Sequence, residues 1–353
     1  SESAKKEADM ALNRSDRILK YIVEYFIKHA QPVGSQTLID EYKLPYSSAT
    51  IRNEMVILEK LGYLEKTHTS SGRVPSSKGY KYYASNLRDG GVDERLKQEL
   101  QNVLAQKTQS IEQTIKASCE ILSHMTNLVS VVMGPDEKLE KLANIQLIQI
   151  NENTVTAVFV TDTGYVENKT FIVPETMKVN DLIQCVKLLN ERLVGTPVTE
   201  LVDKMEALKP LISDYVTSHD LVYQALLETF IRFANDRLSL YGREELFSHP
   251  EFKNDSEKLL GVLKLLNDQS IFKEIDNGDG EEKMSLHVGD IKDNPDVSVV
   301  TAKFKLGEES ENTIALVGPT RMDYDKAISA LNYIAEQLED YFKNGGDDYG
   351  GKA

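Results

Sequence analysis

The beginning of the chain carries apolar residues at steps of three and four, the spacing that places side chains on one face of a helix. Between Leu12 and Ala30 the apolar stripe consists of Ile18, Leu19, Ile22, Val23 and Phe26. Pro32 and Gly34 follow it and are expected to end the helix. We therefore predict an amphipathic helix over 12–30. A second, short helix is expected in VGSQTLIDEY, where Ser35 is suited to the N-cap position.

The stretch YSSATIRNEMVILEKLGYLEK, residues 46–66, predicts a third helix. Ser47 or Ser48 is suited to cap its N-terminus, and Gly62 is suited to end it as the residue after the C-cap. At 100° per residue, one face of this helix collects the apolar side chains of Ile51, Met55, Leu58 and Leu61.

The pattern changes after this third helix. YLEKTHT has the composition of a strand, SSGRVPSS consists of turn-forming residues, and KGYKYYAS follows. We expect a strand pair here with an exposed basic tip. The order of helix, helix, turn, helix and strand pair predicts a winged helix-turn-helix.

The remaining residues alternate between helical and strand patterns. A hinge is expected at Gly90-Gly91, a long helix from Asp93 to Met125, and a short strand in LVSVVMGP. IQLIQI, TVTAVFVT and YVENKTFIV predict an antiparallel meander, because NENT and DTG between them are tight-turn signals. Residues 180–275 are predicted to be mostly helical, with breaks at Pro197, Pro210 and Pro250.

The C-terminal part predicts three more strands and a closing helix. A loop, IDNGDGEEK, precedes the strands MSLHV, DVSVVTAKFKL and ENTIALVGP, and the helix is DYDKAISALNYIAEQLEDYF. Strands at 128–173 and 285–317 thus flank a helical block. We expect a mixed α+β domain interrupted by an insertion, although periodicity leaves open which central strands belong to the insertion.

Charge is distributed unevenly along the chain. The net charge is −15, which by itself disfavours nucleic acid as a partner. Residues 1–90, however, hold 14 basic and 11 acidic residues, and the segment 43–88 holds 8 basic and 3 acidic ones. A basic head on an acidic body is able to hold a polyanion at one place and repel it elsewhere.

Several classes of protein are disfavoured by the sequence. No apolar run is long enough to span a bilayer, and SESAKKEADM lacks the apolar core of a secretory signal, so we expect neither a membrane partner nor secretion. The two cysteines, Cys119 and Cys185, lie far apart, which suits a reducing cytoplasm. There is no H-E-x-x-H motif, no nucleophile elbow and no Walker loop, and we expect no enzyme activity, no metal and no cofactor.

The third helix offers side chains that suit DNA. Opposite its apolar face it carries Arg52, which is able to grip guanine O6 and N7, and Asn53, which is able to grip adenine N6 and N7. Small Ala49 and Thr50 allow a close approach, and Ser47 and Ser48 at the helix N-terminus suit a phosphate.

The expected strand pair adds a second group of candidates. Cations and small hydroxyls around a glycine tip fit phosphates or a narrow minor groove. The complete set of candidate DNA-binding residues is Ser35, Gln36, Ser47, Ser48, Ala49, Thr50, Arg52, Asn53, Lys66, His68, Ser71, Gly72, Arg73, Ser76 and Lys78.

Four segments together resemble the heat-inducible transcription repressor family, HrcA. They are PVGSQTL, SSATIRNEM, LEKLGYLEKTHTSSGRVPSSKGYKYY and, far downstream, LVGPTRMDYDKAISALNYI. The resemblance implies a DNA-reading segment at Ser47–Asn53 and a wing at His68–Ser76. It also implies a homodimeric repressor of chaperone operons, an inverted-repeat operator called CIRCE, release on heat stress, and a GroEL-type chaperonin that keeps the repressor active.

The resemblance also implies a domain organisation. We expect a flexible lead-in at 1–11, a winged helix-turn-helix domain at 12–90 and a flexible tail at 344–353. Between them we expect a GAF-like α/β domain formed by 91–142 and 226–343, interrupted by an inserted dimerising domain at 143–225.

Two other interpretations of the DNA-binding head and the body remain open at this point. The GAF-like body could bind a small effector, which would make the protein a ligand-gated regulator. Alternatively, the winged helix could dock on another protein, although the excess of cations in 43–88 argues against that.

Overall fold

The chain forms two compact units in the computed structural model. The model describes residues 12–67, 72–106, 111–134, 140–173, 175, 178–213, 227, 238–280, 282–291, 294–306 and 310–343. The first unit comprises Ser1–Val132, Ser239–Phe304 and Thr313–Ala353, and the second comprises Met133–Leu238 and Lys305–Asn312. The segment predicted as the insertion, 143–225, lies inside the second unit.

The first unit begins with the three predicted helices: α2 (Arg14–His29), α3 (Ser35–Tyr42) and α4 (Ser48–Lys60). The side chain of Asn13 caps α2, and Ser47 caps α4 by accepting a hydrogen bond from the amide of Thr50. The prediction that Ser35 caps α3 is wrong, because Gly34 occupies the N-cap position. Ser35 instead is buried, and its hydroxyl lies 2.7 Å from that of Ser48.

The wing is a two-stranded antiparallel ribbon of β1 (Leu64–Lys66) and β2 (Arg73–Pro75), in which Leu64 pairs with Pro75. The second strand therefore lies inside SSGRVPSS, which we had expected to be only a turn. KGYKYYAS belongs to a helix, α5 (Ser77–Asn86), because its Tyr80, Tyr83 and Ala84 are buried at helical spacing. Residues 68–71 lie outside the described part of the chain.

The predicted long helix after Gly91 is two helices, α6 (Glu94–Leu104) and α7 (Ile111–Thr126). They pack against each other and against α14 (Tyr324–Lys343). A straight helix cannot pack on itself, so a break between α6 and α7 is required. It was not predicted, because the apolar residues have helical spacing on both sides of it.

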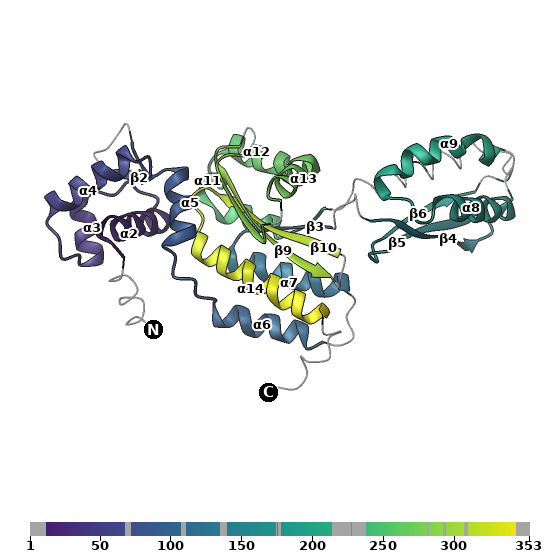
Figure 1. Ribbon diagram of the computed structural model, residues 1–353, viewed down its shortest axis with the longest axis horizontal. Helices are drawn as coiled ribbons and strands as arrows, with labels where there is room; N and C mark the ends of the chain where they lie inside the picture. Colours follow the sequence, from purple (N-terminus) through teal and green to yellow (C-terminus); the bar gives the residue numbers. More distant parts are fainter. Residues whose placement is uncertain are drawn as a thin grey trace. The chain divides into compact units, whose positions relative to one another are not determined.

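A five-stranded sheet forms the centre of the first unit's body, with the order β7-β3-β10-β9-β8. Figure 1 shows α6, α7 and α14 on one side of it, and α12 and α13 on the other. The strands are β3 (Val129–Met133), β7 (Leu238–Tyr241), β8 (Met284–Val288), β9 (Val297–Leu306) and β10 (Ser310–Pro319). Within the described residues, this body also contains η2 (Arg243–Ser248), α11 (Pro250–Lys253), α12 (Ser256–Asn267) and α13 (Gln269–Gly278).

Two sequence predictions about this sheet have different outcomes. The three C-terminal strands and the closing helix are confirmed. The four-residue strand β7 was missed inside a region predicted to be helical, because LSLY is too short for its period to be recognised.

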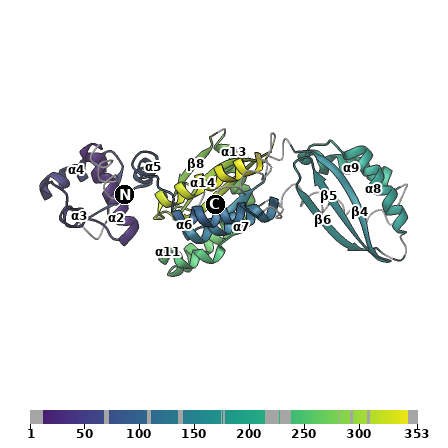
Figure 2. The same cartoon turned by 90° about the horizontal axis from the view of Figure 1, so that it is seen from below.

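The second unit contains the predicted meander, β4 (Leu142–Asn151), β5 (Thr154–Thr161) and β6 (Val166–Ile172), which is confirmed as antiparallel with the order β4-β5-β6. The helices α8 (Val179–Leu193) and α9 (Leu201–Ser213), joined through η1 (Val198–Glu200), lie against one face (Figure 2). Pro210 was predicted to break a helix, but it lies inside the last turn of α9, where it removes a single backbone donor.

Helix α5 joins the winged-helix head, residues 12–90, to the body of the first unit. The ring of Tyr80 packs on Tyr324, with centroids 5.2 Å apart, and Lys81 forms an ion pair of 2.5 Å with Asp290. At the expected hinge, Gly90 has a positive φ of 78°. Its amide donates a 2.8 Å hydrogen bond to Asp325, so the body holds this turn.

Candidate DNA-binding surface

Helix α4 buries one face and presents the other to solvent. Ile51, Met55 and Leu58 are 0%, 5% and 2% exposed, and they pack α4 into the core of the head. Arg52 and Asn53 on the outer face are exposed, and within the described residues neither side chain has a hydrogen-bond or ion-pair partner. The outer face therefore offers one guanidinium and one amide that no described residue of this chain occupies.

Other residues of the predicted reading segment surround these two. Ala49 and Val56 are exposed and flank them on the same face, with Thr50 half-buried beside them. The hydroxyl of Ser47 lies 2.9 Å from that of Thr50. These small or apolar groups allow close approach to a flat surface, and they can contact a thymine methyl group.

The hydroxyls at the α3–α4 junction are arranged differently from one another. Ser47 is exposed at the N-terminus of α4, where backbone amides favour an anion. The Ser35–Ser48 hydrogen bond joins α3 to α4, so the buried Ser35 does not display its hydroxyl. Gln36 is exposed on α3, and its amide donates a 2.9 Å bond to Asp40.

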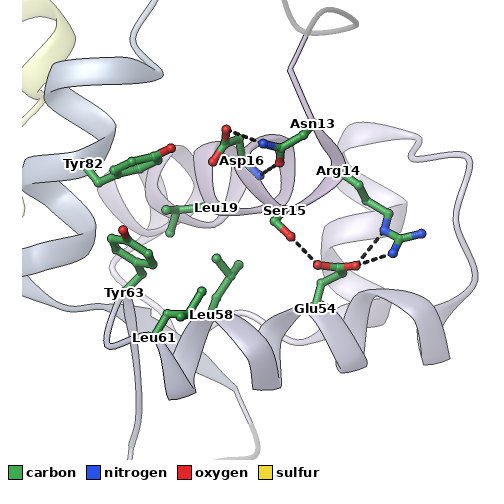
Figure 3. Close-up of a pocket in the computed structure, with 10 residues that line it drawn as sticks. All are labelled: Asn13, Arg14, Ser15, Asp16, Leu19, Glu54, Leu58, Leu61, Tyr63 and Tyr82. Atoms are coloured by element: carbon green, nitrogen blue, oxygen red, sulfur yellow. Dashed lines mark hydrogen bonds and ion pairs between the residues drawn. The ribbon is translucent and has the colours of Figure 1, made fainter.

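A buried carboxylate fixes α4 against α2. Glu54 is 4% exposed, and Arg14 approaches it with nitrogen–oxygen distances of 2.7 and 2.6 Å, while Ser15 donates a 2.5 Å hydrogen bond (Figure 3). The bond from Ser15, supported by the bond and charge of Arg14 and opposed by burial, holds the pKa of Glu54 below its ordinary value.

Glu54, Arg14 and Ser15, here called the clamp, lie at one side of a pocket of about 410 Å³ between α2 and α4. Figure 3 shows the aliphatic side chains at its base and two tyrosines opposite the clamp. The tyrosine rings, Tyr63 and Tyr82, have centroids 5.0 Å apart, and the apolar lining is Leu19, Leu58 and Leu61.

The wing cations have different surroundings. Lys66 on β1 is exposed. Lys78 is also exposed, but its ammonium donates a 2.8 Å bond to the carbonyl of Leu61 and lies 4.6 Å from the centre of the Tyr63 ring. Arg73 is only 13% exposed, and its guanidinium is bonded to Glu59 of α4 at 2.8 and 2.7 Å.

Two other predicted wing residues have internal roles in the structure. Gly72 was expected at an exposed tip, but it is buried, and a Cβ there would lie 2.9 Å from that of Pro32. Ser76 is 7% exposed and caps α5, since its hydroxyl donates to the carbonyl of Gly62 and accepts from the amide of Gly79. His68 and Ser71 lie outside the described residues.

The roles of Glu54, Glu59 and Arg14 were not predicted from the sequence. A signal existed for Glu54, because it falls between Ile51, Met55 and Leu58 on the inward face of α4. A carboxylate at such a position is almost always paired. Nothing comparable marked Glu59, whose partner lies 14 residues further along the chain.

The order of three helices, an antiparallel ribbon and an outward-facing third helix defines a winged helix-turn-helix, a class that places this helix in the DNA major groove. Comparison with known proteins then gives the family. Residues 112–328 match the model of the HrcA protein C-terminal domain. The chain is 36% identical over 333 residues to the heat-inducible transcription repressor HrcA of Halalkalibacterium halodurans, covering 93% of this chain and 97% of that one. The chain therefore belongs to the HrcA family.

A solved structure supports the fold. The crystal structure of a hypothetical protein, 23% identical, covers 94% of this chain and 99% of its own, with a TM-score of 0.64. In the part of the chain that the structure describes, no helix is both long and apolar enough to cross a membrane.

The lowered pKa of Glu54 predicts a pH dependence of the head's stability. Glu54→Gln should destabilise the head at pH 7 by about 1–3 kcal/mol, because it removes hydrogen bonds to a charged acceptor. A depressed carboxyl pKa contributes stability above the ordinary value of 4.5, and this contribution is lost as the pH falls through the folded-state value. The difference between the unmodified chain and the variant should therefore shrink in acid.

Hydrogen exchange of the α2–α4 amides between pH 7 and pH 3, corrected for intrinsic rates, measures this difference. Glu65→Gln is the matched control, because Glu65 is exposed on the wing and should leave head stability nearly unchanged. A gap between Glu54→Gln and the unmodified chain that stayed constant with pH would contradict the assignment.

Proposed function

We propose that this protein is a sequence-specific transcription repressor of chaperone genes that binds an inverted-repeat operator as a homodimer. The outer face of α4, with Arg52 and Asn53 exposed over a buried apolar face, is the observation that carries this proposal. Membership of the HrcA family and a relative described as a heat-inducible transcription repressor support it.

The charges of the head favour binding of a polyanion. The acidic residues in 43–88 are Glu54, Glu59 and Glu65, against eight basic residues. The first two are each bonded to an arginine, which offsets their repulsion of phosphate. In this proposal Arg52 and Asn53 read base edges, while Lys66 and the N-terminus of α4 hold the backbone.

The second unit is proposed to supply the dimer contact. Helices α8 and α9 cover one face of its sheet, and the opposite face carries exposed apolar side chains. Ile148, Val166 and Ile172 are 42%, 49% and 78% exposed. Val166 is paired across the strands with Val160, and Ile172 with Thr154. A second copy burying this face would form a two-fold interface and connect two heads to two half-sites.

Heat is proposed as the signal and a GroEL-type chaperonin as the partner that restores activity. Folding free energies are small, typically ~5–15 kcal/mol, and unfolding is steep in temperature. Residues 91–353 carry 27 basic and 45 acidic residues, and this self-repulsion favours loss of the compact state on heating. A cytoplasmic repressor refolded by chaperonin would then report how much chaperonin is free.

The first expected result concerns base readout. Arg52→Ala should cost about 1–3 kcal/mol of binding to the operator and relax the preference at one base pair. Fluorescence anisotropy against a matched inverted repeat and singly substituted duplexes measures this. Lys66→Ala is the control, since a lost phosphate contact should weaken all duplexes alike and reduce the log K versus log salt slope by ~0.9. Equal losses on every duplex for Arg52→Ala would mean that Arg52 contacts only phosphate.

The second expected result concerns the dimer. Ile172→Lys, which places a charge on the open sheet face, should convert the dimer to a monomer in sedimentation and weaken operator binding, because the two heads are no longer linked. Ile183→Lys is the matched control, since Ile183 of α8 is also exposed, at 46%, but lies on the covering helices. A dimer that survives Ile172→Lys, or is lost equally in both variants, would exclude this face as the contact.

The third expected result concerns heat. Warming the full chain to a mild stress temperature should abolish operator binding, and adding a GroEL-type chaperonin with ATP should raise the active fraction. The active fraction is titrated with excess labelled operator before heating, after heating and after chaperonin is added. Binding that persists through heating and does not respond to chaperonin would remove the heat-sensing part of the proposal and leave DNA binding intact.

A further inference from the structure

Helix α4 carries two acidic residues, and each is bonded to an arginine of a neighbouring element. Glu54 bonds Arg14 of α2, and Glu59 bonds Arg73 of the wing strand β2. The second pair crosses from the last turn of α4 to the ribbon, with both Nε and a terminal nitrogen of Arg73 on one carboxylate oxygen of Glu59, at 2.8 and 2.7 Å. The guanidinium is mostly covered, at 13% exposure, and the carboxylate is 33% exposed.

The backbone around Arg73 is held from both sides. Arg73 pairs with Lys66 of β1, and on its other side its amide and carbonyl each form a 3.0 Å hydrogen bond with Val33. The preceding Gly72 packs closely against Pro32. Strand β2 is thus bonded to the segment between α2 and α3. The Arg73–Glu59 pair joins this strand to α4, the helix that carries Arg52 and Asn53.

We propose that Arg73 and Glu59 are positioning residues, which set the wing and the reading face of α4 at the spacing that a specific DNA site requires. This inference rests on the proposed DNA-binding function. It differs from the expectation that Arg73 contacts phosphate, since the guanidinium lies against Glu59 with little exposed surface. Lys66, the exposed residue paired with Arg73, is the ribbon cation that meets the DNA backbone.

The direction in which Glu59→Gln changes DNA affinity distinguishes a positioning role of Arg73 from a phosphate contact. Removing a carboxylate near DNA normally strengthens binding, because it removes repulsion of the phosphates. Removing a carboxylate that positions Arg73 weakens specific binding instead. Two residues that act through one shared contact also give non-additive losses.

The experiment uses the full chain, an operator-like inverted repeat and a scrambled duplex of the same composition. Arg73→Gln, Glu59→Gln and the double variant are compared at several salt concentrations, with affinities corrected for active fraction. Each single variant should lower the operator-to-scrambled affinity ratio roughly tenfold, and the double variant should lose no more than either single. The salt slope should not change. The exchanged pair, Arg73→Glu with Glu59→Arg, should regain part of the ratio lost in Arg73→Glu alone.

Two matched controls lie on the neighbouring strand. Lys66→Gln should reduce the salt slope by ~0.9 and keep the affinity ratio. Glu65→Gln should tighten both duplexes alike, because it removes only charge. Rescue by the exchanged pair, together with corrected affinities, separates positioning from a loss of folded protein.

Three results would overturn the inference. A reduced salt slope for Arg73→Gln, with tighter binding by Glu59→Gln, would make Arg73 a phosphate contact. If the variants keep the operator-to-scrambled affinity ratio, or lose only active fraction, the Arg73–Glu59 pair has a role in stability alone. An unmodified chain that fails to distinguish the operator from the scrambled duplex would overturn the proposed function as well, whereas the first two results leave that function standing.

Discussion

The orientation of α4 is the constraint on which the rest of the head depends. One short helix must bury Ile51, Met55 and Leu58 and also leave Arg52 and Asn53 in water. Burial of each large apolar side chain is worth about 1.5–3 kcal/mol, which fixes the rotation of the helix about its axis. Arg14 and Arg73 engage the two carboxylates of α4 from either side. The guanidinium of Arg52 and the amide of Asn53 stay exposed on the outer face.

In the proposed function, the second unit and α5 serve the exposed face of α4. A single reading helix contacts one half-site, so specificity for an inverted repeat requires a second copy. The exposed side chains of Ile148, Val166 and Ile172 on the sheet of the second unit are the contact proposed for that copy. Helix α5 connects the head to the body through Tyr80 and Lys81. In the proposed function, base reading belongs to α4 and dimerisation to the second unit, so loss of folding in either is expected to release DNA.

Periodicity predicted much of the fold from sequence, and it failed for physical reasons. The head helices, the meander and the closing helix were found because each has a long apolar stripe or alternation. The gap between α6 and α7 was missed because the apolar spacing is helical on both sides. The exposure of Arg52 and Asn53 was predicted correctly from their place opposite Ile51. Arg73 and Ser76 were predicted as DNA contacts because a cation or hydroxyl that binds phosphate has the same sequence signal as one that binds Glu59 or caps α5.

Methylation interference at guanine N7 tests whether α4 binds in the major groove, because N7 lies in that groove. The measurement uses the full chain bound to an inverted-repeat operator with sparse N7 methylation. If Arg52 contacts guanine, methylation should interfere with binding at equivalent guanines of the two half-sites, and this interference should be lost in Arg52→Ala. Binding that is indifferent to N7 methylation in both half-sites would contradict it.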